Sequence, residues 1–305
     1  LLEFGETSPL KGKRNAWQNF LLNFILNDIN VFTHKIEKNN YENLGFSLKK
    51  AVKNDLTILE NFYRIKGKEI KFLVQEKIDQ KQTFLPDWIN LSPDATEWNY
   101  QKRTFMEELD SRTSWGEMVP NLAQFYRNNG SGIFNSFKAF TWEKGWLGIS
   151  NMDEITFENI IGYENQIQEI KNNTEKLLQG NRANNILLYG DKGTGKSSSV
   201  KAAVNEYWDR GLRLIELKKD DFQDFNEIIS RLDESNLFFV LFIDDLSFSE
   251  VETGYRDLKA TLEGRTKLLP RNVVIYATSN RRHLIKENYS ENGNEIQKQD
   301  SIQEK

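Results

Sequence analysis

The sequence predicts an α/β fold for the second half of the chain, with helices flanking a parallel sheet, after a mainly α-helical first half. Four apolar runs have the length of strands and are separated by helical or turn-rich connections, which is the pattern of a parallel sheet. The run 237–243 is apolar at every position, as expected of a strand that is buried on both faces. The expected strands are Ile186–Tyr189, Leu212–Leu217, Phe238–Ile243 and Val273–Ala277.

The first half shows the periodicity of amphipathic helices. Apolar side chains recur there every three or four residues. Two prolines, Pro86 and Pro93, and polar flanks predict an exposed loop over 83–94. The expected helices cover 17–25, 48–63, 70–78 and 118–126, the last with Pro120 in its first turn.

Two features of the first half leave a partner-binding and a structural interpretation open. Trp88, Trp98 and Trp115 would be partner contacts if they were exposed, although tryptophan is more often buried. The basic cluster 11–14 precedes the first helix, and it fits a solvated helix start better than a DNA contact.

The patterns divide the chain into four parts. Residues 1–134 form the helical domain, and 135–152 form a hairpin or linker with Gly145 in its turn. Residues 153–286 hold the α/β core. The segment 287–305 has almost no apolar residues and is expected to be disordered.

Composition excludes several classes of protein. The 305 residues contain no cysteine and two histidines, which rules out disulfides and thiolate metal sites and makes a histidine metal centre improbable. A net charge of -4 gives no general attraction to nucleic acid or anionic lipid. No apolar run approaches the length of a membrane span, and no signal peptide is recognisable, so we expect a cytoplasmic protein with no membrane partner.

The segment Gly190–Ser197 matches the P-loop pattern G-x-x-x-x-G-K-[ST] directly after an expected strand. Glycines let the backbone curl so that N–H groups point at phosphate oxygens, and the following helix adds its positive N-terminal end. Lys196 would reach the β- and γ-phosphates, and the Ser197 hydroxyl would bind Mg²⁺. The sequence therefore predicts binding of a nucleoside triphosphate with Mg²⁺.

Acidic and amide side chains follow two other expected strands. Asp244 would hold Mg²⁺, mostly through water, and Asp245 would orient and deprotonate an attacking water. Asn280, after the fourth strand, would face the γ-phosphate. The alternatives are a polar turn or helix cap for the acidic pair and a plain loop asparagine for Asn280. Arg281 and Arg282 would contact phosphate, a neighbouring subunit or water alone.

Together these motifs resemble the AAA+ class of P-loop ATPases, whose members pack a segment like Phe157–Glu164 against adenine. The resemblance implies ATP as the nucleotide, Lys196, Asp245 and Asn280 as catalytic residues, and a sheet order of five-one-four-three-two. The metal ligands would be Ser197 and Asp244. The expected nucleotide-binding residues are Ile160, Ile161, Gly162, Gly190, Asp191, Lys192, Gly193, Thr194, Gly195, Lys196, Ser197 and Ser198.

The segments 243–246 and 278–281 are similar to those of bacterial replication initiators and helicase loaders. Over most of 135–290 the chain also resembles a family of bacterial ATP-binding proteins of undefined function. Members of that family and class continue into a fifth strand, an arginine finger and a helical lid, which the resemblance places beyond Lys305. Because the sequence also starts without methionine, we expect a fragment whose arginine finger lies outside it, on a later segment or a neighbouring copy.

The leading functional hypothesis is an ATPase that couples ATP binding and hydrolysis to the remodelling or loading of an unknown partner. That partner, a protein or a nucleic acid, would bind the N-terminal domain, and subunits would associate as homo-oligomers. One alternative is a nucleotide-gated scaffold with negligible hydrolysis. A small-molecule kinase also uses a P-loop on a parallel sheet, but the acidic pair, the adenine-side segment and Asn280 argue against it.

Overall fold

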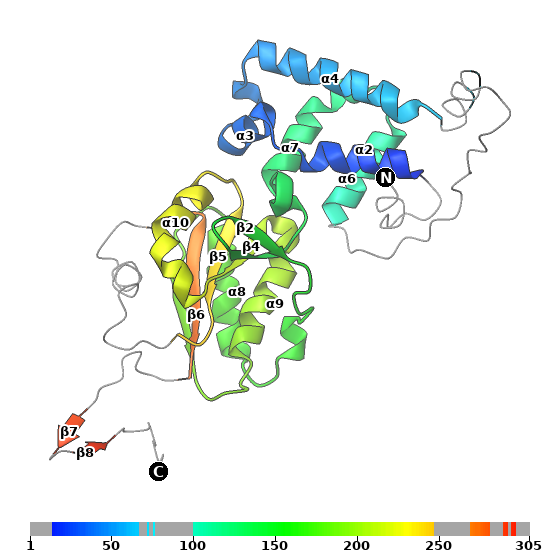
Figure 1. Ribbon diagram of the computed structural model, residues 1–305. Helices are drawn as coiled ribbons and strands as arrows, with labels where there is room; N and C mark the ends of the chain where they lie inside the picture. The colour runs from blue at the N-terminus through cyan, green and yellow to red at the C-terminus, as the bar shows by residue number, and fades with distance from the viewer. Residues whose placement is uncertain are drawn as a thin grey trace. The chain divides into compact units, whose positions relative to one another are not determined.

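The computed structural model describes residues 14–66, 72, 76, 100–246, 269–280, 289–291 and 294–296. The chain forms two compact units, 1–136 and 137–305 (Figure 1). Within the described ranges, none of the helices combines the length and the apolar character needed to cross a membrane.

The first unit is helical, as predicted. Asn15 and Asn30 begin two of its helices with capping boxes. In each box the asparagine side chain accepts from the backbone N–H three residues later, and the side chain of that residue accepts from the asparagine N–H. The predicted helices over 17–25, 48–63 and 118–126 are confirmed; the first two are longer at both ends, and the third begins one residue later and ends three residues later than expected. The predictions for 70–78 and 83–94 lie outside the described residues, apart from 72 and 76, which are helical. The helices are α2 (Ala16–Asn27), α3 (Val31–Lys38), α4 (Phe46–Arg64), α6 (Tyr100–Ser111) and α7 (Val119–Asn129).

Trp115 belongs to the core of this unit. Its side chain is fully buried, and its Nε1 donates a hydrogen bond of 2.7 Å to the Leu109 carbonyl. Its backbone N–H donates to Glu60 Oε2 at 2.7 Å. Of the two interpretations left open for Trp115, burial in the core is confirmed and the exposed partner contact is excluded. Trp88 and Trp98 lie outside the described residues.

Arg14 also differs from expectation. The cluster 11–14 suggested a solvated helix start, yet the Arg14 side chain is 1% exposed and its Nε lies 3.6 Å from Asp110. The other residues of that cluster are outside the described part of the chain.

The second unit contains the predicted parallel sheet. The strands β3 (Ile186–Tyr189), β4 (Leu212–Glu216), β5 (Phe238–Ile243) and β6 (Val273–Ser279) lie in the order β4-β5-β6-β3 with parallel pairing throughout. In chain order these are the second, third, fourth and first strands of the α/β core. The arrangement agrees with the one-four-three-two part of the order that the resemblance implied.

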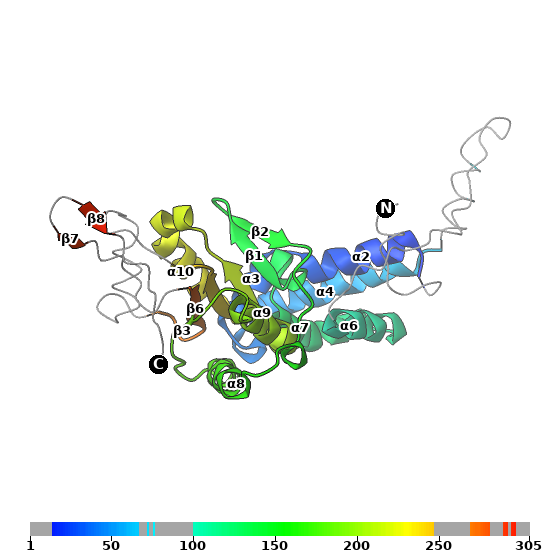
Figure 2. The same ribbon diagram turned by 90° about the horizontal axis from the view of Figure 1, so that it is seen from below.

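A hairpin extends this sheet beyond β4. The strands β1 (Ala139–Trp142) and β2 (Trp146–Ile149) pair antiparallel (Figure 2), and β1 pairs parallel with β4. Phe140 and Trp142 are buried, and Trp142 Nε1 donates to Asp224 Oδ2 at 3.0 Å. The residues expected to form a hairpin or linker therefore include two strands of the sheet itself.

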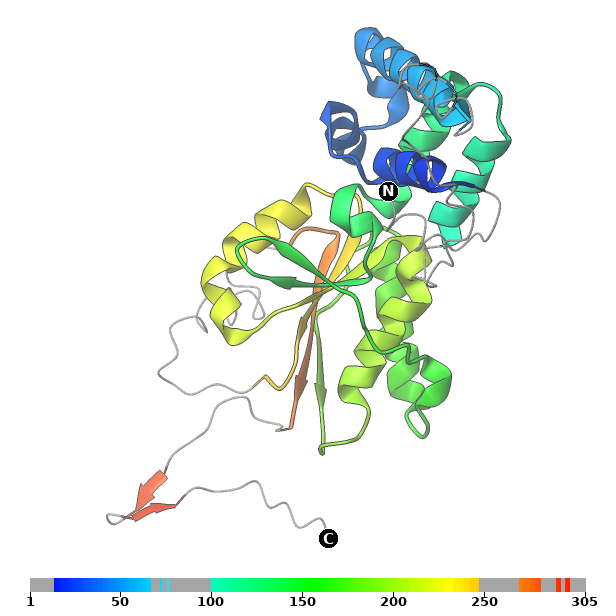
Figure 3. The same cartoon turned by 45° about the vertical axis from the view of Figure 1, so that its right-hand side comes forward.

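Helices cover both faces of the sheet. Figure 3 shows α8 (Glu164–Leu178) and α9 (Lys196–Tyr207) on one face and α10 (Phe225–Asp233) on the other. Strand side chains alternate between the two sides, so Val240 and Phe242 pack with α8 and α9 while Phe239 and Leu241 face the opposite way. This burial on both faces explains the continuous apolar run in the sequence.

The tail contains two short strands. β7 (Tyr289–Glu291) and β8 (Asn294–Ile296) pair antiparallel, which differs from the disorder expected over those six residues. They form a separate two-stranded sheet.

The burial of Glu60 predicts a measurable difference in stability. Glu60→Ala leaves the buried Trp115 N–H without its acceptor, and we expect the free energy of unfolding of the first unit to fall by about 1–3 kcal/mol. Glu117→Ala removes only the exposed ion pair with Lys53 and is expected to cost at most about 1 kcal/mol. Urea unfolding of both variants measures the two losses of stability. Equal unfolding midpoints would contradict the stabilising role of the hydrogen bond between Glu60 and the Trp115 N–H.

Candidate nucleotide and metal site

The P-loop connects the end of β3 to the start of α9. Gly190 N–H donates to the Ser279 carbonyl at 3.3 Å, which ties the start of the loop to the end of β6. Gly193 and Gly195 have φ angles of 84° and 79°, in the left-handed region that favours glycine. Gly195 is the N-cap of α9, so the free N–H groups of that helix begin at the loop. The loop thereby presents the donors and the helix dipole that an anion requires.

Lys196 lies against the loop carbonyls. Its Nζ donates to the Gly190 carbonyl at 2.8 Å and to the Asp191 carbonyl at 2.7 Å. Thr194 Oγ1 donates to the same Asp191 carbonyl at 2.8 Å. These acceptors are neutral, and phosphate oxygens form stronger hydrogen bonds with an ammonium group. The lysine is therefore positioned where an incoming phosphate would compete for it.

The other predicted loop residues lie around this turn. Asp191, Lys192 and Gly193 are exposed, and Ser198 is half-buried in the first turn of α9. Ser199, which follows, is buried and its Oγ donates to the Gly195 carbonyl at 2.9 Å. The exposed part of the loop is thus its 191–193 segment.

Ser197 and Asp244 meet at the carboxyl edge of the sheet. Ser197 Oγ donates to Asp244 Oδ1 at 2.6 Å. Asp244 is exposed and Ser197 half-buried. Mg²⁺ prefers hydroxyl, carboxylate and phosphate oxygens and retains several waters, so this pair fits its ligand preference. Across the described ranges, no group of three or more histidine, cysteine or acidic residues is arranged to hold a metal ion.

Thr278 joins the two aspartates, a role that the sequence did not indicate. Its Oγ1 donates to Asp244 Oδ1 at 2.5 Å and accepts from the Asp245 N–H at 2.9 Å. β6 extends two residues beyond the expected end at Ala277, through Thr278 and Ser279, which are both buried. The only hint in the sequence was a hydroxyl residue at the end of a strand.

Asp245 and Asn280 are also brought together. Asn280 Nδ2 donates to Asp245 Oδ1 at 3.1 Å, and both residues are exposed. Asp245 has a φ of 52°, a conformation that aspartate tolerates better than most residues and that often occurs at functional sites. The amide holds one carboxylate oxygen, which leaves the other to accept a proton. Arg281 and Arg282 lie outside the described residues.

The segment 153–160 lies along α9 and reaches the P-loop. Lys201 Nζ donates to Asp153 Oδ2 at 2.6 Å, and Asn205 Nδ2 donates to the Asp153 and Ile155 carbonyls. The hydrogen bond and charge of Lys201 lower the pKa of the Asp153 carboxyl. These contacts fix the segment that leads to Ile160, and sequence reasoning missed both α9 residues.

Of the three predicted adenine-side residues, Ile160 is beside the P-loop. Its Cγ2 lies 3.6 Å from the position that a Cβ on Gly195 would occupy. Ile161 is 85% exposed, and Gly162 adopts a φ of 89°. The structure therefore brings Ile160 to the loop, while Ile161 faces solvent.

The sheet and the loop define a P-loop α/β domain. Residues 135–305, more than half of the chain, match the family described as "Protein of unknown function (DUF815)". The chain belongs to this family. No protein with a curated description matched the chain.

Three solved structures are similar to part of the chain. PCH-2 of C. elegans is 23% identical over 42% of this chain and 40% of its own, with a TM-score of 0.32. A RuvB mutant of Thermotoga maritima is 17% identical, with a TM-score of 0.31, and AMPPCP-bound DnaA of Aquifex aeolicus is 27% identical, with a TM-score of 0.30. Each of these two matches covers 43% of both chains. The match thus spans less than half the length of these structures.

The position of Thr278 generates a prediction about metal binding. Thr278→Val removes the hydrogen bond to Asp244 and leaves the Asp245 N–H unpaired, so we expect ATP affinity in the presence of Mg²⁺ to fall about tenfold. Affinity in EDTA should change little. Thr278→Ser keeps the hydroxyl and is the matched control. Titration of each variant with a fluorescent ATP analogue tests this, and an equal loss with and without Mg²⁺ would contradict it.

Proposed function

We propose that the chain is a Mg²⁺-dependent ATP-binding protein that hydrolyses ATP to ADP and phosphate. The observation that carries this proposal is a continuous series of hydrogen bonds across the carboxyl edge of the sheet. It joins Ser197, Asp244, Thr278, Asp245 and Asn280. Hydrolysis needs a phosphate cradle, a metal ligand and a general base within one site, and this series connects all three.

Each side chain receives a separate role. The backbone N–H groups of 191–195 and the start of α9 would hold the phosphates, and Lys196 would exchange its carbonyl partners for phosphate oxygens. Ser197 and Asp244 would bind Mg²⁺, which, when bound, neutralises charge on the phosphates. Asp245 would accept the proton of the attacking water, and Asn280 would keep its carboxylate oriented. Ile160 would contact the base.

The AAA+ class is the closest description of this proposal. Two observations support this assignment. The motifs resemble those of the class, and the strand order β4-β5-β6-β3 matches the one-four-three-two part of the order that the resemblance implied. In such proteins, hydrolysis drives a change of shape that acts on a partner. We therefore propose that this chain remodels or loads a partner held by its N-terminal unit, and that copies of the chain associate so that one supplies an arginine to the next.

Two substitutions separate binding from hydrolysis. Lys196→Ala should weaken ATP binding and abolish turnover, because the ammonium group contacts the phosphates. Asp245→Asn should retain binding but lower turnover at least about a hundredfold, because an amide cannot accept the proton. Phosphate release measures turnover, and a fluorescent ATP analogue measures binding. Asp220→Asn, an exposed acidic residue of the short helical segment after β4, serves as the control.

The other outcomes identify the competing functions. Wild-type turnover in Asp245→Asn would exclude the assigned catalytic role. Tight ATP binding without turnover, at any protein concentration, would favour the nucleotide-gated scaffold. Consumption of ATP only in the presence of a small-molecule acceptor would favour the kinase.

A further inference from the structure

α4 carries an apolar stripe that its own unit covers only in part. Leu48, Val52, Leu59 and Phe62 follow the spacing of one helix face. The stripe packs on the core of the first unit, yet Phe62 is 48% exposed. From Leu48 to Phe62 the stripe is about 21 Å long at the helical rise of ~1.5 Å per residue.

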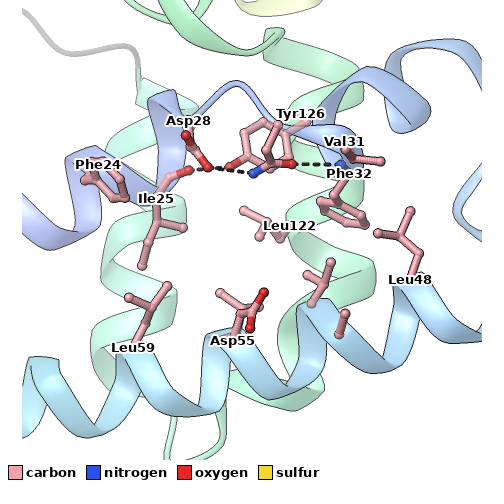
Figure 4. Close-up of a pocket in the computed structure, with 14 residues that line it drawn as sticks. Phe24, Ile25, Asp28, Val31, Phe32, Leu48, Asp55, Leu59, Leu122 and Tyr126 are labelled. Carbon is pink, nitrogen blue, oxygen red and sulfur yellow. Dashed lines mark hydrogen bonds between the residues drawn. The ribbon is translucent and has the colours of Figure 1, made fainter.

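The part of the stripe from Leu48 to Leu59 forms one wall of a cavity of about 390 Å³ (Figure 4). Ile25 from α2, Phe32 from α3, and Leu122 and Tyr126 from α7 form the other walls. Every residue that lines the cavity belongs to the first unit. The cavity can therefore be described without reference to the nucleotide-binding unit.

Large apolar side chains surround the cavity and face solvent. Phe24 is 52% exposed and Val31 is 63% exposed. Phe24 ends a row of stacked rings on α2, with centroids 6.1 Å apart from Phe20 and 5.8 Å between Phe20 and Trp17. Trp17 Nε1 donates to the Phe62 carbonyl at 3.0 Å, so this row begins beside the end of α4. Exposed apolar surface of this extent commonly marks a binding groove.

Two carboxylates lie within this apolar surface. Asp28, after α2, and Asp55, on α4, line the cavity from different sides (Figure 4). Asp28 accepts a hydrogen bond from Asn30 Nδ2 at 2.6 Å. Neither carboxylate has an ion-pair partner among the residues that the structure describes.

The lysines of α4 are directed to other partners. Lys49 Nζ donates to the Glu42 carbonyl and lies over the Tyr41 ring, and Lys53 Nζ is 2.5 Å from Glu117 Oε1. The cavity lining includes no cationic side chain. The groove formed by the stripe, the cavity and the exposed rings is therefore apolar and negatively charged, a combination that repels nucleic acid phosphates and attracts a cation.

We propose that this groove binds an amphipathic helix of a partner protein that carries lysine or arginine within its apolar face. Helix-in-groove recognition uses apolar anchors at i, i+3, i+4 and i+7, and the stripe has the length for a helix of about 14 residues. The cation of the partner would lie between Asp28 and Asp55. A small amine would occupy the cavity alone and would leave Phe62 uncovered. The binding does not depend on ATP hydrolysis.

A synthetic peptide tests the proposal with the full chain. The probe is a fluorescent amphipathic peptide of about 14 residues, with leucine at i, i+3, i+4 and i+7 and two lysines within that face. Its control has glutamate in place of the two lysines. Fluorescence anisotropy should show micromolar binding of the lysine peptide and at least about tenfold weaker binding of the glutamate peptide.

Matched variants locate the binding. Asp28→Asn and Asp55→Asn should each weaken binding of the lysine peptide about three- to tenfold. Each should also reduce the preference of the chain for the lysine peptide over the glutamate peptide. Phe62→Ala should weaken the binding of both peptides. Glu107→Gln, an exposed acidic residue of α6, is the control and should change neither. Circular dichroism checks that each variant is folded.

Several results would overturn the proposal. Equal affinity for the two peptides, or no binding of either by the folded chain, would exclude the cation-selective groove. Binding unaffected by Asp55→Asn and Phe62→Ala would place the peptide elsewhere. Light scattering that shows a dimer abolished by Phe62→Ala, with no peptide binding, would show that a second copy covers the surface. Displacement of the lysine peptide by hexylamine with no effect of Phe62→Ala would identify a small amine as the ligand.

Discussion

The register of the parallel strands is the constraint on which the proposed site depends. Ile243 pairs with Ala277 and Tyr189 with Ser279, so β5, β6 and β3 end together at one edge of the sheet. The residues that follow these strands are therefore brought within hydrogen-bonding distance, although they are far apart in the sequence. A shift of one residue would turn Thr278 to the other face of β6 and break both of its bonds to the acidic pair.

The two units present surfaces of different chemistry. The P-loop unit offers N–H groups, a lysine and a helix N-terminus, which favour an anion. The groove of the helical unit offers apolar side chains and two carboxylates, which favour a cationic and apolar partner. We therefore propose that one unit binds the nucleotide and the other binds a basic amphipathic segment of a protein. The groove chemistry narrows the expected partner from protein or nucleic acid to protein.

The sequence predicted features that depend on local pattern and left out those that depend on packing. The apolar runs predicted all four core strands, and G-x-x-x-x-G-K-[ST] located the loop beside Lys196. The pairing of β1 with β4 brings together residues about 75 positions apart, and no local pattern encodes it. Thr278 is a common residue in strands, so nothing in its local sequence predicted its hydrogen bonds to Asp244 and Asp245. Those bonds follow from the register of β6 with β5. Burial of Trp115 and the place of Asp55 in an apolar groove likewise depend on how helices pack.

The most direct test of the central claim is a crystal structure of the full chain with Mg²⁺ and a non-hydrolysable ATP analogue. We predict that Lys196 Nζ leaves the Gly190 and Asp191 carbonyls for phosphate oxygens, with a metal ion bound by Ser197 Oγ and close to Asp244. The adenine should lie against Ile160. A nucleotide bound elsewhere, with Lys196 still on its two carbonyls and Ser197 still donating to Asp244, would contradict the account.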